Sequence, residues 1–238
     1  MRLLAGGVAL SLGVVIGTPC AVADTWGGSL ALTSDYLVRG ISRSNQDPAL
    51  QLDLHYASDL GIIAGVFASN TQIEPRESRD VELSGFFGFA WRNGDSWTGR
   101  VLASYYAYPW NQQGTRYNYA EFDADLVYQG WLQLNLNYSP DAPRFMPFYG
   151  LISVTEEAAE INVQRPIIGK LSATAGLGYS HMGGADPAGY VYWSAGGSYD
   201  LGPVSLAISY ADTTSGAKTL FPNEAVTGRW LGTVIWRF

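Results

Sequence analysis

Apolar and polar residues alternate along most of this chain with a period of two. The last segment, residues 226–238, shows the pattern clearly. One set of alternate positions holds only valine, glycine, tryptophan and phenylalanine, and the other holds threonine, arginine and two aliphatic residues. Successive side chains of a strand point to opposite faces of its sheet. The pattern therefore predicts strands with one aromatic, apolar face and one polar face.

About twelve such segments follow one another, and the connections between them alternate between short and long. In residues 50–56, three leucines and a tyrosine alternate with Gln51, Asp53 and His55. Tight turns are predicted at 58–61, 92–95, 129–130, 166–170 and 201–203. Loops are predicted at 40–47, 71–79, 109–116, 139–157, 181–188 and 212–225. The first strand is expected to continue towards Arg39.

This alternation of tight turns with longer loops is typical of outer-membrane barrels. Backbone groups in lipid must all be paired, so strands with an apolar outer face have to close into a cylinder around their polar faces. The predicted fold class is all-β. Residues 24–238 are expected to form a transmembrane, antiparallel, up-and-down β-barrel of about twelve strands, with short periplasmic turns and longer extracellular loops. The alternative is a soluble sandwich whose last strand happens to end in phenylalanine.

The first 23 residues have the features of a secretory signal peptide. A positive charge at Arg2 precedes an apolar run, a break at Pro19 and small residues that end at Ala23. This order predicts cleavage after Ala23, and Cys20 is then lost with the leader. The mature chain would contain no cysteine, which excludes a disulfide framework, a zinc-thiolate site and a cysteine nucleophile.

Charge and composition restrict the classes of partner. Without the leader, 13 basic residues face 21 acidic ones, and this balance argues against a nucleic-acid partner. The 15 tyrosines, 8 tryptophans and 28 glycines, with only 15% charged residues, suit a barrel in lipid. No residue cluster has metal-ligand spacing, and no cofactor is expected. The expected partners are outer-membrane lipids, the machinery that assembles barrels, and small polar solutes or ions. The oligomeric state is left open.

The end of the chain resembles the terminal strand of bacterial outer-membrane barrels. In those proteins a C-terminal phenylalanine, with apolar or aromatic residues at alternate positions before it, is read by the assembly machinery. Trp236 and Phe238 occupy these positions here. The resemblance implies that they form the assembly signal, and that the last strand closes the cylinder against the first.

A block near the N-terminus, residues 34–42 with the sequence SDYLVRGIS, is followed by PALQ at residues 48–51. It resembles the N-terminal signature of the TorF family of predicted porins, a proteobacterial family of otherwise unknown function. The resemblance implies an exported β-barrel and says little about cargo. The signature residues are Ser34, Asp35, Tyr36, Arg39 and Gly40. Arg39 either holds the first outer loop or lines its mouth, or it pairs with Asp35 while Gly40 permits a turn.

Charged residues on the polar faces are predicted to line the interior. They are Asp53, His55, Glu82, Arg100, Glu121, Asp123, Asp125 and Arg229, and Arg165 is placed with them. The excess of acids would favour cations through the local field. Two other interpretations stay open: the charges pair across the barrel and plug it, or they form a specific ligand site.

Two histidines raise the question of catalysis, because some twelve-stranded outer-membrane barrels are lipid hydrolases that use serine and histidine. His55 lies on a polar face without a serine motif, and His181 follows Ser180 but lacks a third member. The sequence therefore predicts a porin-like channel of the bacterial outer membrane, for diffusion of small polar solutes or ions and with a preference for cations, rather than an enzyme. The alternatives are a lipid-modifying hydrolase, and a structural or adhesive barrel with a plugged lumen.

Overall fold

A computed structural model describes residues 24–72, 79–111, 114–146, 149–184, 187–222 and 226–238. The predicted signal peptide, its cleavage site and Cys20 lie outside these residues. Among the described residues, twelve antiparallel strands form one closed barrel. They are β1 (Thr25–Thr33), β4 (Ala49–Ala57), β5 (Ile62–Thr71), β6 (Asp80–Asn93), β7 (Trp97–Ala107), β8 (Tyr119–Tyr128), β9 (Leu132–Met146), β10 (Gly150–Ile168), β11 (Leu171–Met182), β12 (Ala188–Asp200), β13 (Val204–Thr213) and β14 (Arg229–Arg237).

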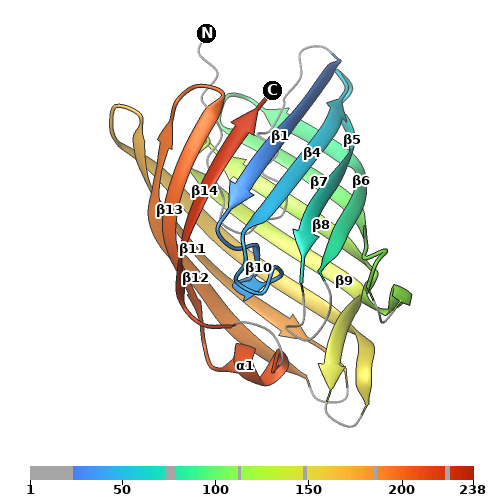
Figure 1. Ribbon diagram of the computed structural model, residues 1–238. Coiled ribbons are helices and arrows are strands. Elements are labelled where there is room, and N and C mark those ends of the chain that lie inside the picture. Colours follow the sequence, from blue (N-terminus) through green and yellow to red (C-terminus); the bar gives the residue numbers. More distant parts are fainter. Residues whose placement is uncertain (1–23, 73–78, 112–113, 147–148, 185–186, 223–225) are drawn as a thin grey trace.

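Each barrel strand pairs with the strands next to it in the chain, and β1 pairs with β14 to close the cylinder. At this seam the Gly28 and Phe238 backbones exchange two hydrogen bonds, of 3.0 and 3.1 Å. Figure 1 shows the start of β1 and the C-terminus at the same end of the barrel, together with the tight turns. We call this the turn end, and the opposite one the loop end. The predicted fold class is confirmed, and so is the pairing of the last strand with the first.

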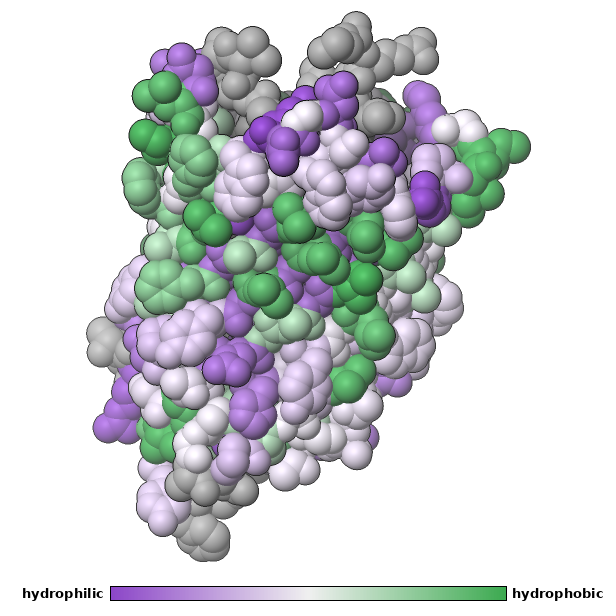
Figure 2. Space-filling model, turned by 180° about the vertical axis from the view of Figure 1, so that it is seen from behind, coloured by the Kyte–Doolittle hydropathy of each residue, from purple (hydrophilic) through white to green (hydrophobic). Residues whose placement is uncertain are grey.

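The alternation of side chains also has the predicted sense. In β4, Leu50 is 54% exposed on the outside, whereas Gln51 and Asp53 are each 3% exposed on the inside. Figure 2 shows many hydrophobic side chains over the middle of the rear face. An outer surface of exposed leucine, phenylalanine and tryptophan over a polar interior is the reverse of a soluble fold and suits lipid. Among the described residues, no helix combines the length and the hydrophobicity that crossing a bilayer requires.

The loop predicted at residues 139–157 is wrong, because β9 and β10 run through it as the two longest strands of the described chain. Their register continues to the pair formed by Gly150 and Met146. Pro140 and Pro143 suggested a loop, but β8 pairs with β9 only as far as Tyr138. Beyond that point one edge of β9 is free of ladder bonds, and proline is tolerated at a strand edge because it has no N–H to donate.

One other connection differs from the prediction, and two of the predicted loops contain a short helical turn. The first strand ends at Thr33 rather than near Arg39, and the chain then forms a small separate hairpin of β2 (Leu37–Val38) and β3 (Ile41–Ser42). The connection from β13 to β14 contains a short helix, α1 (Gly216–Leu220), and the connection from β7 to β8 contains a 3-10 turn, η1 (Gly114–Tyr117).

Candidate functional site

The connection between β1 and β4, residues 34–48, folds into the barrel, and we call it the luminal segment. Figure 1 draws its β2–β3 hairpin in blue near the loop end. Tyr36, Leu37 and Ile41 are each at most 2% exposed. Side chains buried to this extent lie within the barrel and do not rest on its rim.

Apolar side chains of the luminal segment contact several sides of the barrel. Tyr36 packs with Phe67 of β5, with ring centroids 6.3 Å apart. Leu37 belongs to one cluster with Leu231 of β14. Ile41 belongs to the largest cluster, whose other buried members are Ala142, Val154, Met182, Tyr190, Tyr192, Ala217, Leu220, Phe221 and Val226. Strands β9 to β12 and helix α1 thus join the luminal segment in a hydrophobic core at the loop end.

Asp35 organises the polar side of this segment. Ser42 Oγ and Ser44 Oγ donate to Asp35 Oδ1 at 2.6 and 2.9 Å. Arg229 of β14 donates to Asp35 Oδ2 at 2.5 Å. The expected pair between Asp35 and Arg39 is therefore wrong, because Asp35 is neutralised by an arginine that lies 194 residues away in the sequence.

Arg39 crosses the lumen instead. Its guanidinium group forms ion pairs with Glu121 of β8 and with Glu156 of β10, the latter at 3.0 Å. All three side chains are at most 8% exposed. A buried guanidinium group between two carboxylates is well compensated, because each charge keeps a close partner of opposite sign.

Glu82 of β6 forms a further polar contact with the luminal segment. Tyr36 Oη donates to Glu82 Oε1 at 2.7 Å, and Tyr108 Oη donates to Glu82 Oε2 at 2.5 Å. Burial and the neighbouring Glu82 carboxylate raise the pKa of Tyr36 well above its ordinary value. Tyr36 therefore keeps its proton and serves as a donor to Glu82.

The three acids of β8 share the inner face but have different partners. Glu121 pairs with Arg39, as described, and Asp125 pairs with Arg100 and also accepts a hydrogen bond from Asn135. Asp123 accepts from the neutral amide of Asn137. Arginines therefore offset two of the three charges directly.

Asp53 and His55 also face the interior, towards the turn end. His55 Nδ1 lies 2.6 Å from Asp53 Oδ1, and a Cβ atom on Gly27 would lie 2.8 Å from His55 Nε2. Asp53 thus occupies His55 Nδ1, and the residue beside His55 Nε2 in these contacts is Gly27 and not a serine nucleophile. Among the described residues, no cluster of histidine, cysteine, aspartate and glutamate could hold a metal ion.

Two residues considered in the sequence lie elsewhere. Arg165 points outward, with its guanidinium carbon 3.6 Å above the ring of Trp131, so its placement in the interior is wrong. Ser180 is fully buried and donates to Glu156 Oε1 at 2.8 Å. His181 is the next residue of β11 and therefore points to the other face, so these two side chains do not form a catalytic pair.

Several interior residues were not singled out in the sequence. Glu156 lay in a predicted loop, although its alternation with Ala158 and Glu160 is the inner-face pattern of β10. Tyr108 and Tyr192, which donate to Glu82 and Glu160, are aromatic residues that the pattern assigns as readily to lipid. Alternation could have identified Glu156, whereas the tyrosines carry no local signal.

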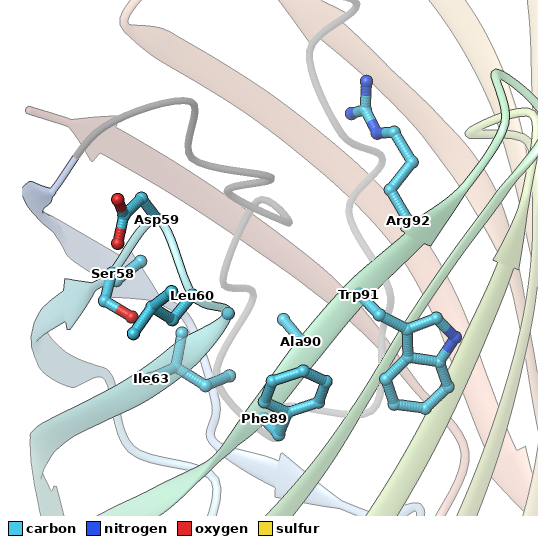
Figure 3. A pocket seen from close by; sticks show the side chains of 10 residues that line it. Ser58, Asp59, Leu60, Ile63, Phe89, Ala90, Trp91 and Arg92 are labelled. Atoms are coloured by element: carbon cyan, nitrogen blue, oxygen red, sulfur yellow. The ribbon is translucent and has the colours of Figure 1, made fainter.

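A pocket of about 250 Å³ lies at the turn end, between the β4–β5 turn and the end of β6. Figure 3 shows its lining, in which the Asp59 carboxylate and the Arg92 guanidinium group point away from each other. Phe89 and Ile63 also line the pocket. Because its charged groups do not converge, the pocket has no evident binding chemistry.

Comparisons with known proteins agree with the barrel. The KdgM porin is 9% identical, with a TM-score of 0.53 over 89% of this chain and 99% of that one. The NanC porin is 10% identical, with a TM-score of 0.56 over 89% of this chain and 98% of that one. At these identities the likeness shows a fold of the porin type. No curated protein matches the sequence.

The sequence does match one family, over residues 19–234. This range includes the luminal segment, eleven of the twelve barrel strands and most of the twelfth, β14. The chain therefore belongs to Gcw_chp, a family of bacterial proteins of unknown function.

Proposed function

We propose that this protein is a porin-like channel of the bacterial outer membrane, through which small polar solutes or ions diffuse. The main support is the polar interior. Among the described residues, the buried atoms Asp53 Oδ2, Arg100 Nη1, Gln164 Oε1 and Arg237 Nη2 have no hydrogen-bond partner in the protein. An unsatisfied buried polar group costs about 1–3 kcal/mol, so these groups favour an interior that holds water.

The proposed channel prefers cations, because acids outnumber arginines on the inner side. The inward-facing acids are Asp35, Asp53, Asp80, Glu82, Glu121, Asp123, Asp125, Glu156, Glu160 and Asp200. The inward-facing arginines are Arg39, Arg43, Arg100, Arg144, Arg229 and Arg237. A low-dielectric wall around an excess of negative charge concentrates cations in the bore.

Recording from the purified, refolded protein in a planar bilayer tests the channel directly. We expect discrete conductance steps, and in a salt gradient a reversal potential on the cation side. Protein that has been boiled before addition is the control for detergent artefacts. A correctly folded barrel that never conducts would contradict the proposal.

The identification with TorF stays a prediction, and so do the assembly machinery as a partner and the outer membrane as the location.

Replacing Leu134 by lysine tests whether the outer surface faces lipid. Leu134 of β9 is 40% exposed, between Leu126 and Ile161 on the neighbouring strands. A lysine on the lipid-facing surface of a barrel costs about 2–4 kcal/mol at the bilayer midplane and about 0–1 kcal/mol near an interface. Leu134 is the third residue of β9, near the turn end, so we expect Leu134→Lys to lower the free energy of unfolding in lipid vesicles by an amount between these limits. Leu60→Lys, at a turn position that is 74% exposed, is the control and should change little. Equal effects of the two substitutions would contradict a membrane position.

A further inference from the structure

We propose that the luminal segment is a plug that Arg39 fastens to the far wall, and that the position of this plug, more than the barrel wall, sets the conductance. This inference rests on the proposed channel function. It assigns to residues 34–48 a specific role, the obstruction of the bore, and to Arg39 the role of a positioning residue.

The first argument is the path of the segment across the bore. Both of its ends continue into β1 and β4, which are neighbours in the barrel. In the closed order of twelve strands, the position opposite β1 is that of β9, and β8 and β10 flank it. These are the two strands whose glutamates pair with Arg39. The segment therefore spans the lumen from one wall to the other.

The second argument is the backbone at Arg39. Val38 pairs with Ile41, so Arg39 and Gly40 form a two-residue hairpin turn, with φ of 50° and 80°. Such a turn favours asparagine, aspartate or glycine at its first position, because other side chains are strained in the left-handed region. The two ion pairs that the Arg39 side chain forms account for an arginine at this strained position.

The third argument is the number of directions in which the segment is held. Asp35 is tied to Arg229 of β14, and Tyr36 to Glu82 of β6. The Gln72 amide donates to the Arg43 carbonyl at 2.7 Å, next to the end of β5. With Arg39, these contacts reach around the barrel. A segment anchored in this way has one defined position and does not move as a free loop.

Two substitutions break the ion pair between Arg39 and Glu121 from opposite sides. Together they distinguish an obstruction of the bore from an effect of charge alone on the conductance. Arg39→Gln makes the interior more negative, whereas Glu121→Gln makes it less negative. If the segment is a plug, both variants loosen it, and both should raise single-channel conductance several-fold over that of the original protein. Their reversal potentials in a salt gradient should move in opposite directions. If the ion pair only contributes charge, the conductances for cations should also move in opposite directions, which would overturn the proposal.

Gly40→Ala provides a second variant that leaves every charge in place. A Cβ atom there would lie 2.5 Å from Thr213 Cγ2 and 3.0 Å from Tyr192 Cβ. Gly94→Ala is the matched control, because Gly94 also has a positive φ, of 62°, but nothing lies within 4 Å of its Cβ position. We expect Gly40→Ala to raise conductance or to produce frequent transitions to a larger open level, and Gly94→Ala to behave like the original protein. Equal behaviour of the two would argue against the plug.

Deletion of residues 37–42, with a short glycine linker in their place, distinguishes failure of the plug from failure of the channel. If the original protein is silent and the folded deletion variant conducts, the plug holds and the proposal that the original protein conducts by itself fails. If both conduct equally, the channel holds and the plug is overturned. If the folded deletion variant is silent, both fail. Circular dichroism and heat-dependent mobility on gels establish that each variant is folded.

Discussion

Replacing Glu121, Asp123 and Asp125 together by glutamine and asparagine is expected to move the reversal potential in a salt gradient towards zero, or to the anion side. The three carboxylates lie at alternate positions of β8, about 7 Å apart. Their removal takes three negative charges from one side of the bore but leaves Arg39 and Arg100 in place. This is the largest change of interior charge that a single strand offers, because no other described strand carries three acids on its inner face.

Glu157→Gln is the matched control for this experiment. Glu157 directly follows the buried Glu156 in β10 but is exposed on the outer face. It removes one acid without changing the interior, so the reversal potential should stay where it is. An unchanged reversal potential in a clearly conducting triple variant would show that selectivity resides elsewhere. The ion pairs of Glu121 and Asp125 also make Asp123→Asn informative, because Asp123 contacts an amide and its replacement unpairs no arginine.

Deletion of Phe238 is expected to reduce the amount of assembled barrel several-fold without reducing synthesis. The Phe238 backbone makes both hydrogen bonds to Gly28 at the seam, each worth about 1 kcal/mol. Its ring lies 5.0 Å from that of Trp236, and a Cβ atom on Gly28 would lie 2.9 Å from it. Gly28 thus leaves room for the ring at the point where the cylinder closes, and the deletion removes both the ladder bonds and this packing.

The measurement is the fraction of the protein in the outer-membrane fraction that shows heat-dependent mobility on gels, relative to total protein. Phe238→Tyr is the control, since it keeps the ring and the backbone bonds, and it should assemble nearly as well as the original. Normal assembly of the deletion variant would contradict a role of the terminal residue, both in closing the seam and as an assembly signal.

The sequence alone predicted the barrel because one local rule determines it. Alternation with a period of two decides which side chains face outward, and in lipid the unpaired backbone edges of such strands must close. The polar positions of β4 and β8 could therefore be read strand by strand, including Asp53 and Glu121. At residues 139–157 the prolines misled instead, because a proline is compatible with a strand wherever that strand has a free edge, and an edge is a property of the whole sheet.

Only the tertiary structure decided what the interior contains. The partners of Arg39 lie 82 and 117 positions away along the chain, and the partner of Asp35 lies 194 away. No periodicity relates residues at such separations, because their proximity follows from the closure of the cylinder and from the path of the luminal segment within it. The signature residues Asp35, Tyr36 and Arg39 were visible in the sequence, but as the start of an outer loop. Their burial across the bore followed only when the barrel had enclosed them, since buried charges select partners by distance in space.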